Sequence, residues 1–426
     1  MTRCGRVALS GALLHDPLRA AASSRQDDAG AATGGASPVS LDVTPERFPA
    51  LVIRGDDVSR DPRGRPAAFR GFADPCVRRD PVTGELWLAY SWPHVEYPGG
   101  SWRRPAVGVE THLALSRDDG RSWQRTQVLW PRTAARFRDP VKGVARDGFV
   151  SHEVPNLLPC PVEGRPAWLG ARLDYFLGRD GNYKDRDNLS FCLRLLGAPT
   201  PAALAEAPLL TFGHDRSSPE CDVDVNLCRL STDFPAVFVP NEPALRFEND
   251  RLFLAFVVMV FHGQTPDFGK SFVAVLSTEP RGAVRSWRWR YHGKLATHVE
   301  ARELGGESLT QIELAPARDG RLLAFLTPES WSAEGARDFG GDAFGGIRHH
   351  GCAVVEVASL ERPALARRQD GRLAVRALLR SSTGSEHGPG AAGYDARSAT
   401  GVLYTLRDVA DQRELSWSLH PTGLHP

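Results

Sequence analysis

The sequence lacks an excess of charge of either sign. Its 426 residues include 52 Lys and Arg against 51 Asp and Glu, a formal net charge of +1. A balance of this kind gives no long-range field that would attract nucleic acid or an anionic membrane, so any partner must be recognised by a local group of side chains. Runs of about 18 apolar residues are also missing, which argues against a membrane-spanning helix.

Metal-binding cysteine motifs and helical periodicity are likewise missing. None of the seven cysteines forms a C-x-x-C pair, which argues against a zinc ribbon and favours small buried thiols. The one helix-like piece, residues 201–207, is short, whereas 32 Pro and 41 Gly favour short elements joined by tight turns. Segments of alternating apolar and polar residues recur from Val39 onward, so the predicted fold class is all-β.

The octet formed by residues 116–123, S-R-D-D-G-R-S-W, follows one such alternating run. Asp118 can accept hydrogen bonds from the amides of the turn, Gly120 can supply a positive φ, and Trp123 can cover the turn with an apolar lid. We therefore predict a self-capping strand–turn–strand. The octet resembles the Asp box (S-x-D-x-G-x-x-W) of sialidases and related β-propellers, where it lies on the outer rim of a blade. The resemblance implies architecture and not catalysis.

A loose repeat of about 80 residues organises the chain from residue 39 to residue 426. Its markers are polar residues that open a unit of three or four strands: Asp74, Glu153, Glu242, Gln311 and Asp395. Such a repeat predicts a single β-propeller domain with four-stranded antiparallel blades. We count five blades, with six as the alternative because of long loops. The last unit is one strand short, and an N-terminal strand in residues 48–54 is expected to complete it.

The first strands of a propeller line its central channel, so their acidic residues become neighbours there. Asp74, Glu153 and Glu242 are therefore candidate catalytic carboxylates. Glycoside hydrolysis needs such a group, with one carboxyl protonated to assist the leaving oxygen and another ionised to activate water or attack the sugar. Candidate substrate-binding residues lie on or beside the same first strands: Arg70, His152, Gln311, Tyr394, Asp395 and Arg397.

Two motifs resemble the five-bladed propeller glycosidases, the arabinanase, xylosidase and invertase-like group. The Ala-Asp-Pro run at residues 73–75 is similar to their opening strand, which implies Asp74 as general base or nucleophile. The Asn-Glu-Pro run at residues 241–243 looks like their third blade, which implies Glu242 as general acid. Their second blade carries an Asp, and here the match fails, with Glu153 or Asp139 nearby. The resemblance implies an exo-acting glycosidase that cleaves a glycan or oligosaccharide.

Two other functions remain open. A sialidase would use three arginines and a tyrosine, for which Arg70, Arg246, Arg397 and Tyr394 are candidates, although Ala-Asp-Pro stands where a sialidase has Arg-Ile-Pro. The third possibility is a non-catalytic carbohydrate-binding propeller. All three functions predict a carbohydrate partner. No cofactor is predicted, apart from a structural calcium ion in the channel as an alternative, and the oligomeric state is left open.

Two further segments carry expectations. In residues 1–38, Arg3 and Arg6 precede a short apolar run, and a Ser-, Asp-, Gly- and Ala-rich tract follows. This pattern favours a poor signal peptide or a disordered tract, and hence a secreted or periplasmic protein, with a cytoplasmic one as the alternative. Residues 286–291, S-W-R-W-R-Y, predict a strand with one aromatic face, with a sugar platform as the less favoured interpretation.

Overall fold

The computed structural model describes residues 37–97, 106–138, 143–178, 190–205, 210–217, 222–262, 265–282, 284–334, 346–383, 392–411 and 414–426. The chain divides into two units, Met1–Ser37 and Pro38–Pro426, and all the sheets belong to the second. All but the last two residues of the predicted N-terminal tract, 1–38, lie outside the described residues.

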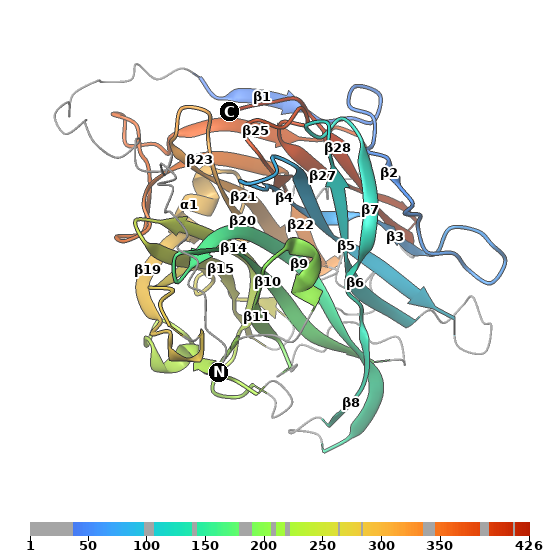
Figure 1. Ribbon diagram of the computed structural model, residues 1–426, viewed down its shortest axis with the longest axis horizontal. Helices are drawn as coiled ribbons and strands as arrows, with labels where there is room; N and C mark the ends of the chain where they lie inside the picture. Colours follow the sequence, from blue (N-terminus) through green and yellow to red (C-terminus); the bar gives the residue numbers. More distant parts are fainter. Residues whose placement is uncertain are drawn as a thin grey trace, which may run out of the picture. The chain divides into compact units, whose positions relative to one another are not determined.

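Four sheets share one plan, in which an innermost strand is followed outward by antiparallel neighbours in chain order (Figure 1). The first sheet holds β4 (Ala73–Arg79), β5 (Leu86–Glu96), β6 (Ala106–Ser116) and β7 (Trp123–Trp130). The second holds β9 (Ala145–Val162), β10 (Arg165–Gly178), β11 (Cys192–Ala198) and β12 (Leu210–Gly213), with β8 (Thr133–Arg138) on the other side of β9. The third holds β14 (Val239–Glu248), β15 (Arg251–Met259), β18 (Phe272–Thr278) and β19 (Arg290–Thr297). The fourth holds β20 (Ser308–Pro316), β21 (Leu322–Trp331), β23 (Cys352–Ser359) and β25 (Val375–Arg380).

A fifth sheet is built differently. Its strands are the two-residue β26 (Ala392–Gly393), then β27 (Leu403–Asp411), β28 (Glu414–Pro421) and the parallel β3 (Phe69–Gly71). Short strands add to the edges of the first, second and fourth sheets: β1 (Val39–Asp42), β2 (Ile53–Arg54) and β13 (Val225–Asn226). Two more, β22 (Ile347–His349) and β24 (Ala364–Leu365), pair with β21 and β23 of the fourth sheet. A separate ribbon pairs β16 (Phe261–His262) with β17 (Thr265–Pro266). The helical elements of the described residues are α1 (His298–Glu303) and the 3₁₀ turns η2 (Pro201–Ala205), η4 (Leu227–Arg229) and η5 (Val284–Ser286).

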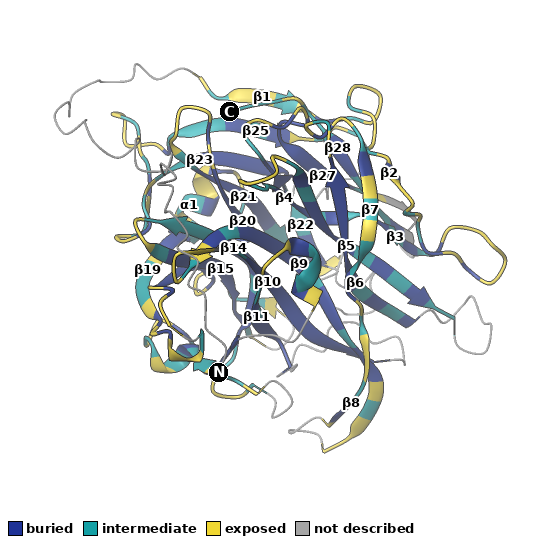
Figure 2. Ribbon diagram, viewed as in Figure 1, coloured by how far each residue is buried: buried dark blue, intermediate teal, exposed yellow. Residues whose placement is uncertain are grey.

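This all-β fold has a β-propeller arrangement, in which we recognise four blades. Hydrogen bonds join successive blades: Val154 N donates to Ser91 Oγ at 3.0 Å, and Asn241 Nδ2 donates to Thr310 O at 3.3 Å. Buried residues dominate the inner and middle strands, whereas β7 and β8 carry exposed ones (Figure 2). The predicted fold class is thus confirmed. Residues 201–205 of the helix-like piece predicted at 201–207 form a 3₁₀ turn, and residues 206–207 lie outside the described residues; α1 was not predicted.

The strand that adds to the last sheet is not the predicted one. Within residues 48–54, β2 pairs in parallel with β7 of the first blade. Two single hydrogen bonds reach β28: Leu51 N donates to Leu419 O at 2.7 Å, and His420 Nδ1 lies 2.6 Å from Phe48 O. It is β3 that pairs with β28. Gly71 allows this pairing because it has a φ of +109°, and a Cβ there would lie 1.9 Å from Trp417 O.

A buried polar cluster, which we call the hub, joins the inner strands of the four blades. Arg78 in β4 donates to Glu313 Oε1 and, at 3.3 Å, to Leu314 O in β20. Asn156 in β9 donates from Nδ2 to Glu313 Oε2 at 2.5 Å, and its Oδ1 accepts from Leu245 N in β14 at 3.0 Å. Arg78, Asn156 and Glu313 are 9%, 2% and 3% exposed. Each blade therefore supplies one member of a single hydrogen-bonded group.

The octet forms the self-capping turn predicted from its residues. Ser122 N donates to Asp118 Oδ1 at 2.9 Å, and the indole Nε1 of the buried Trp123 donates to Gly120 O at 3.0 Å. Asp119 O accepts from Ala399 N at 2.6 Å, so the turn also holds the loop that follows β26. The octet therefore fastens the fifth sheet to the first blade.

Replacing Gly120 by Ala should lower the free energy of unfolding by about 1–3 kcal/mol, because φ is +89° and a Cβ would lie 2.6 Å from Ser398 Oγ. Gly84→Ala is the matched control, since Gly84 has a φ of +76° and a Cβ added there would meet no atom within 4 Å. Urea titration measures both variants. Equal losses in the two variants would mean that the contact with Ser398 contributes nothing.

Arg78→Met should destabilise the protein by about 3–5 kcal/mol, because it leaves the carboxylate of Glu313 buried without its cation. The double variant Arg78→Met/Glu313→Gln should lose much less than the sum of the two single variants, since no unpaired charge remains. A double-mutant cycle by chemical denaturation tests this. Additive losses would show that the two side chains do not act as a pair.

Candidate functional site

The inner strands of the first three blades share a bulge. The antiparallel register shifts between Ala73 and Cys76 in β4, and at the corresponding points of β9 and β14. At each bulge a residue with positive φ precedes a proline: Asp74 (+50°), Val154 (+54°) and Glu242 (+51°). Positive φ is strained for these residues, and most of all for β-branched Val154. A bulge of this kind re-aims a side chain and recurs beside active sites.

The bulges define which positions are equivalent. Asp74 and Glu242 occupy the same position in the first and third blades, and Val154 occupies it in the second. In the fourth blade the register shift falls between Leu309 and Gln311, which assigns the position to Thr310. The repeat markers Glu153 and Gln311 were therefore each wrong by one residue as equivalents of Asp74. The physical reason is that the extra residue of a bulge does not show in the spacing of a repeat.

Asp74 and Glu153 nevertheless share a neighbour, Tyr175 of β10. The Tyr175 hydroxyl donates to Glu153 Oε2 at 2.6 Å. Burial raises the pKa of Tyr175 well above its usual value, and the charges of Glu153 and Asp74 raise it further. The phenol therefore stays protonated and brings the carboxylates of two adjacent blades into one environment. Tyr175 is 1% exposed and lies on a second strand, so the search of first strands missed it.

The fourth blade adds a carboxyl group that sequence analysis did not select. Glu329 in β21 is 1% exposed and bonds the side chains of Thr310 and Ser308. Its Oε2 has no hydrogen-bond partner among the described residues. Burial raises the pKa of Glu329 to about 8, so this carboxyl holds a proton at neutral pH. Glu242, at 9% exposure, lies on the adjacent inner strand, where its neighbour Asn241 bonds Thr310 O.

His152 and Gln311 are held by partners within their own blades. His152 Nδ1 lies 2.6 Å from Asp174 Oδ1, and Arg172 Nε donates to the same oxygen at 2.8 Å. Burial raises the pKa of Asp174, but the charges of Arg172, His152 and Arg194 outweigh it and hold this pKa below its usual range. Gln311 Oε1 accepts from Thr327 Oγ1 at 2.9 Å. Both predicted ligands thus have structural partners.

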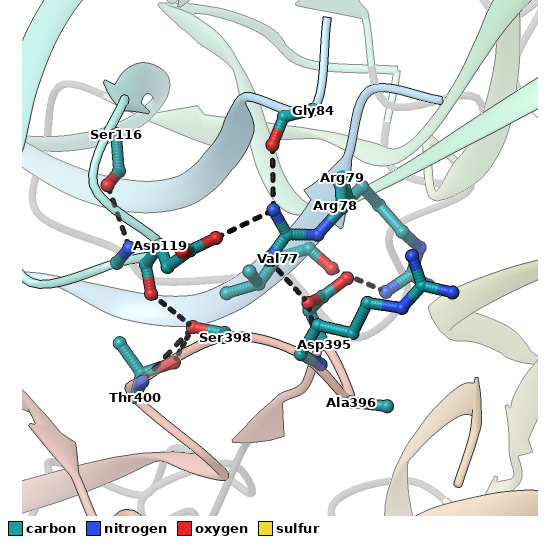
Figure 3. Close-up of polar contacts among 12 residues, drawn as sticks. Val77, Arg78, Arg79, Gly84, Ser116, Asp119, Asp395, Ala396, Ser398 and Thr400 are labelled. Atoms are coloured by element: carbon teal, nitrogen blue, oxygen red, sulfur yellow. Dashed lines mark hydrogen bonds and ion pairs between the residues drawn. The ribbon is translucent and has the colours of Figure 1, made fainter. Parts of the chain in front are cut away.

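The structure places Asp395 and Arg397 at the far end of the first strand. Arg79, the last residue of β4, bonds Asp119 Oδ1 at 2.9 Å and Asp395 Oδ1 at 3.2 Å (Figure 3). Asp395 Oδ1 also accepts from Arg397 N at 3.0 Å. Five residues of extended strand, about 16 Å, separate Arg79 from Asp74. The structure therefore does not bring Asp395 and Arg397 to Asp74.

Tyr394 and Arg70 also lie apart from the bulges. Tyr394 is 1% exposed, and its ring centroid lies 5.3 Å from that of Phe325 in the seam between the fourth blade and the fifth sheet. Arg70, predicted to lie beside a first strand, lies instead on β3 at the outer edge of the fifth sheet, where its Nη1 donates to Ala67 O at 2.9 Å. Of the three sialidase-type arginines, only Arg246 lies on an inner strand.

The described part of the chain holds no group of three or more His, Cys, Asp or Glu side chains arranged to hold a metal ion. Among its cysteines, Cys76, Cys160, Cys228 and Cys352 are free thiols. None of the described helices is both long and apolar enough to cross a membrane.

No protein-family model and no curated protein matches this chain. Similar solved structures include Zg3597, a family 117 glycoside hydrolase of Zobellia galactanivorans, with 10% identity, a TM-score of 0.44 and coverage of 88% of this chain and 90% of that one. A GH62 hydrolase in complex with xylotriose has 10% identity, a TM-score of 0.41 and coverage of 87% and 94%. Penicillium chrysogenum α-L-arabinanase complexed with arabinobiose has 11% identity, a TM-score of 0.37 and coverage of 83% and 81%. At this level of similarity we transfer neither substrate nor mechanism.

The buried carboxyl of Glu329 predicts a pH dependence of stability. Because its pKa is about 8 in the folded state against 4.5 ordinarily, the folded state binds more protons, and stability falls as pH rises from about 4.5 to 8. Glu329→Gln should remove this fall, which amounts to roughly 3 kcal/mol by pH 7.

Denaturant titrations of wild type and variant from pH 5 to pH 8 measure this difference. Glu307→Gln, which changes an exposed carboxylate of the same blade, should follow the wild-type pH profile. Parallel profiles for wild type and Glu329→Gln would contradict a neutral Glu329.

Proposed function

We propose that this protein is a glycoside hydrolase that cleaves a glycan or oligosaccharide with Asp74 and Glu242. The observation that carries the proposal is their equivalence: each carboxylate stands at the strained bulge of an inner strand, in the first and third blades. Two carboxyl groups that converge from different strands are the machinery that glycoside hydrolysis requires. Strain that recurs at the same position is typical of a functional site.

The surroundings of the two carboxylates suggest their roles. Glu242 is 9% exposed, and a carboxyl in such an environment serves as general acid. Asp74 is half-buried and takes the role of base or nucleophile. Glu153 accepts a hydrogen bond from the Tyr175 hydroxyl, whose pKa is raised, after burial, by the charges of both Glu153 and Asp74. This assigns Glu153 a modulating role.

We also propose that the fifth sheet is the fifth blade and that β3 closes it. Two contacts support this closure: Arg318 Nε donates to Ala396 O at 2.8 Å, and Ala399 N donates to Asp119 O at 2.6 Å. The fifth sheet is thereby bonded to the fourth blade on one side and to the first on the other. In this arrangement the octet is an Asp box of the outer rim. An exo-acting enzyme of this kind, secreted or periplasmic, accords with the pattern of residues 1–38.

A screen of aryl glycosides, including a sialoside, tests the function. Wild type should hydrolyse at least one, and Glu242→Gln should lose about 10²–10⁴-fold in kcat on a poor leaving group and much less on a dinitrophenyl glycoside, which needs no acid. Asp74→Asn should be inactive on both substrates, because the base or nucleophile is needed whatever the leaving group.

Glu85→Gln, in the β4–β5 turn, is the matched control and should retain wild-type rates. Unchanged turnover in Glu242→Gln would refute its assignment as acid. Hydrolysis of the sialoside alone would favour the sialidase alternative. If the wild-type protein bound oligosaccharides and hydrolysed none of them, the function would be that of a non-catalytic carbohydrate-binding propeller.

A further inference from the structure

A groove of about 620 Å³ lies away from the inner strands, between the outer edges of the second and third blades. On one side it is bounded by β12, β13 and η4 of the second blade, and on the other by η5 and the residues that lead into β19. Three strand spacings, about 14 Å, separate these edges from the innermost strands of the same blades. The groove is therefore distinct from the candidate catalytic site.

Residues 286–291 were predicted to be a strand with one aromatic face, but only Arg290 and Tyr291 belong to a strand, β19, because η5 ends at Ser286 and residues 287–289 are irregular. Residues 287–289 form one wall of this groove. Trp287 and Trp289 are buried, at 5% and 9% exposure, and Arg288 between them is exposed. The Trp287 indole donates to Gly282 O at 3.4 Å, and the Trp289 ring meets Phe212 edge-on at 4.9 Å. The two tryptophans are thus packed into the protein, and Arg288 between them is exposed to solvent.

The charge of the groove is positive. Arg229 at the end of η4, Arg285 within η5 and Arg288 line it together with one carboxylate, that of Asp224. Asp224 Oδ2 already accepts from Thr211 N at 2.9 Å. Among the described residues none of the three arginines forms an ion pair, although other arginines at the blade edges do. Three guanidinium groups from two blades therefore line one hollow, and none of them forms an ion pair within the described part of the chain.

One residue of the groove lining also has a buried hydrogen-bond donor without a partner among the described residues. Trp289 lines the groove, and its Nε1 has no hydrogen-bond partner among the described residues. A buried indole N–H usually finds a partner, so the unpaired N–H of Trp289 is an exception in the wall of the groove. The groove thus combines one unpaired donor with three cations that bind carboxylate or sulfate in bidentate fashion.

We propose that this groove binds an anionic glycan, a chain that carries uronate carboxylates or sulfate esters. The anionic character follows from the arginines, whereas the assignment to a glycan rests on the proposed function. A polymer bound there is held at the outer edge of the blades, while another part of the same polymer reaches the channel. Arg229, Arg285 and Arg288 are binding residues in this scheme and take no part in catalysis.

Affinity electrophoresis of the full chain tests the proposal with three polymers: polygalacturonate, dextran sulfate and neutral arabinan. Wild type should be retarded by at least one anionic polymer and not by arabinan, with a retardation that weakens as salt increases. The triple variant Arg229→Ala/Arg285→Ala/Arg288→Ala should lose at least tenfold in affinity. Retardation by polygalacturonate would identify carboxylate as the recognised group, and retardation by dextran sulfate would identify sulfate.

Arg281→Ala is the matched control, because Arg281 precedes η5 in the same turn, outside the groove lining, and already faces Glu279 at 3.7 Å. It should bind like wild type. Wild-type affinity in the triple variant, or equal binding of a short DNA duplex and the glycans, would overturn the proposal. Aryl glycoside hydrolysis should be unchanged in the triple variant, and polymer binding should be unchanged in Glu242→Gln. Polymer binding therefore tests the proposal for the groove, and aryl glycoside hydrolysis tests the catalytic assignment, so that either can fail without the other.

Discussion

The hub of Arg78, Asn156 and Glu313 is the interaction on which the site depends. An ion pair this deeply buried costs desolvation, and it is tolerated only when every oxygen and N–H that faces inward finds a partner. Here the carboxylate of Glu313 accepts hydrogen bonds from the side chains of Arg78 and Asn156, and Asn156 Oδ1 accepts one from Leu245 N. Because these groups come from four inner strands, the strands are fixed in their mutual positions. The bulges lie a few residues away on the same strands. Their positions relative to one another are therefore fixed as well.

Because the inner strands are held rigidly, the side chains at the bulges have defined positions. A residue in the left-handed region before a proline is unfavourable in an isolated strand, so three of them at equivalent positions require a surrounding structure that holds them. In the first and third blades the presented residue is a carboxylate, and in the second it is Val154. An apolar residue between two acids limits repulsion among them, and Tyr175 supplies the nearby hydrogen-bond donor that Val154 cannot.

Much of the fold could be predicted from sequence, because alternation and turn residues are local signals. The hairpins of the four blades and the octet lie where their residues indicated. The strand that pairs with β28 could not be predicted, since residues 48–54 and β3 are both short, and the choice depends on how closely Gly71 approaches Trp417. Asp74 and Glu242 were found through their Pro neighbours, whereas Tyr175 and Glu329 lie on second strands and become visible only through burial and cross-strand contact.

The two ends of β4 show how stability and candidate function are separated within one strand. At Arg79 the strand end is held by Asp119 and Asp395, so its charges are neutralised and the fifth sheet is bonded to the first blade. At Asp74 the backbone is strained, and the neighbouring groups are carboxylates and a protonated phenol. The strain at Asp74 is therefore sustainable because the ion pairs at Arg79 and the hub at Arg78 stabilise the same strand elsewhere.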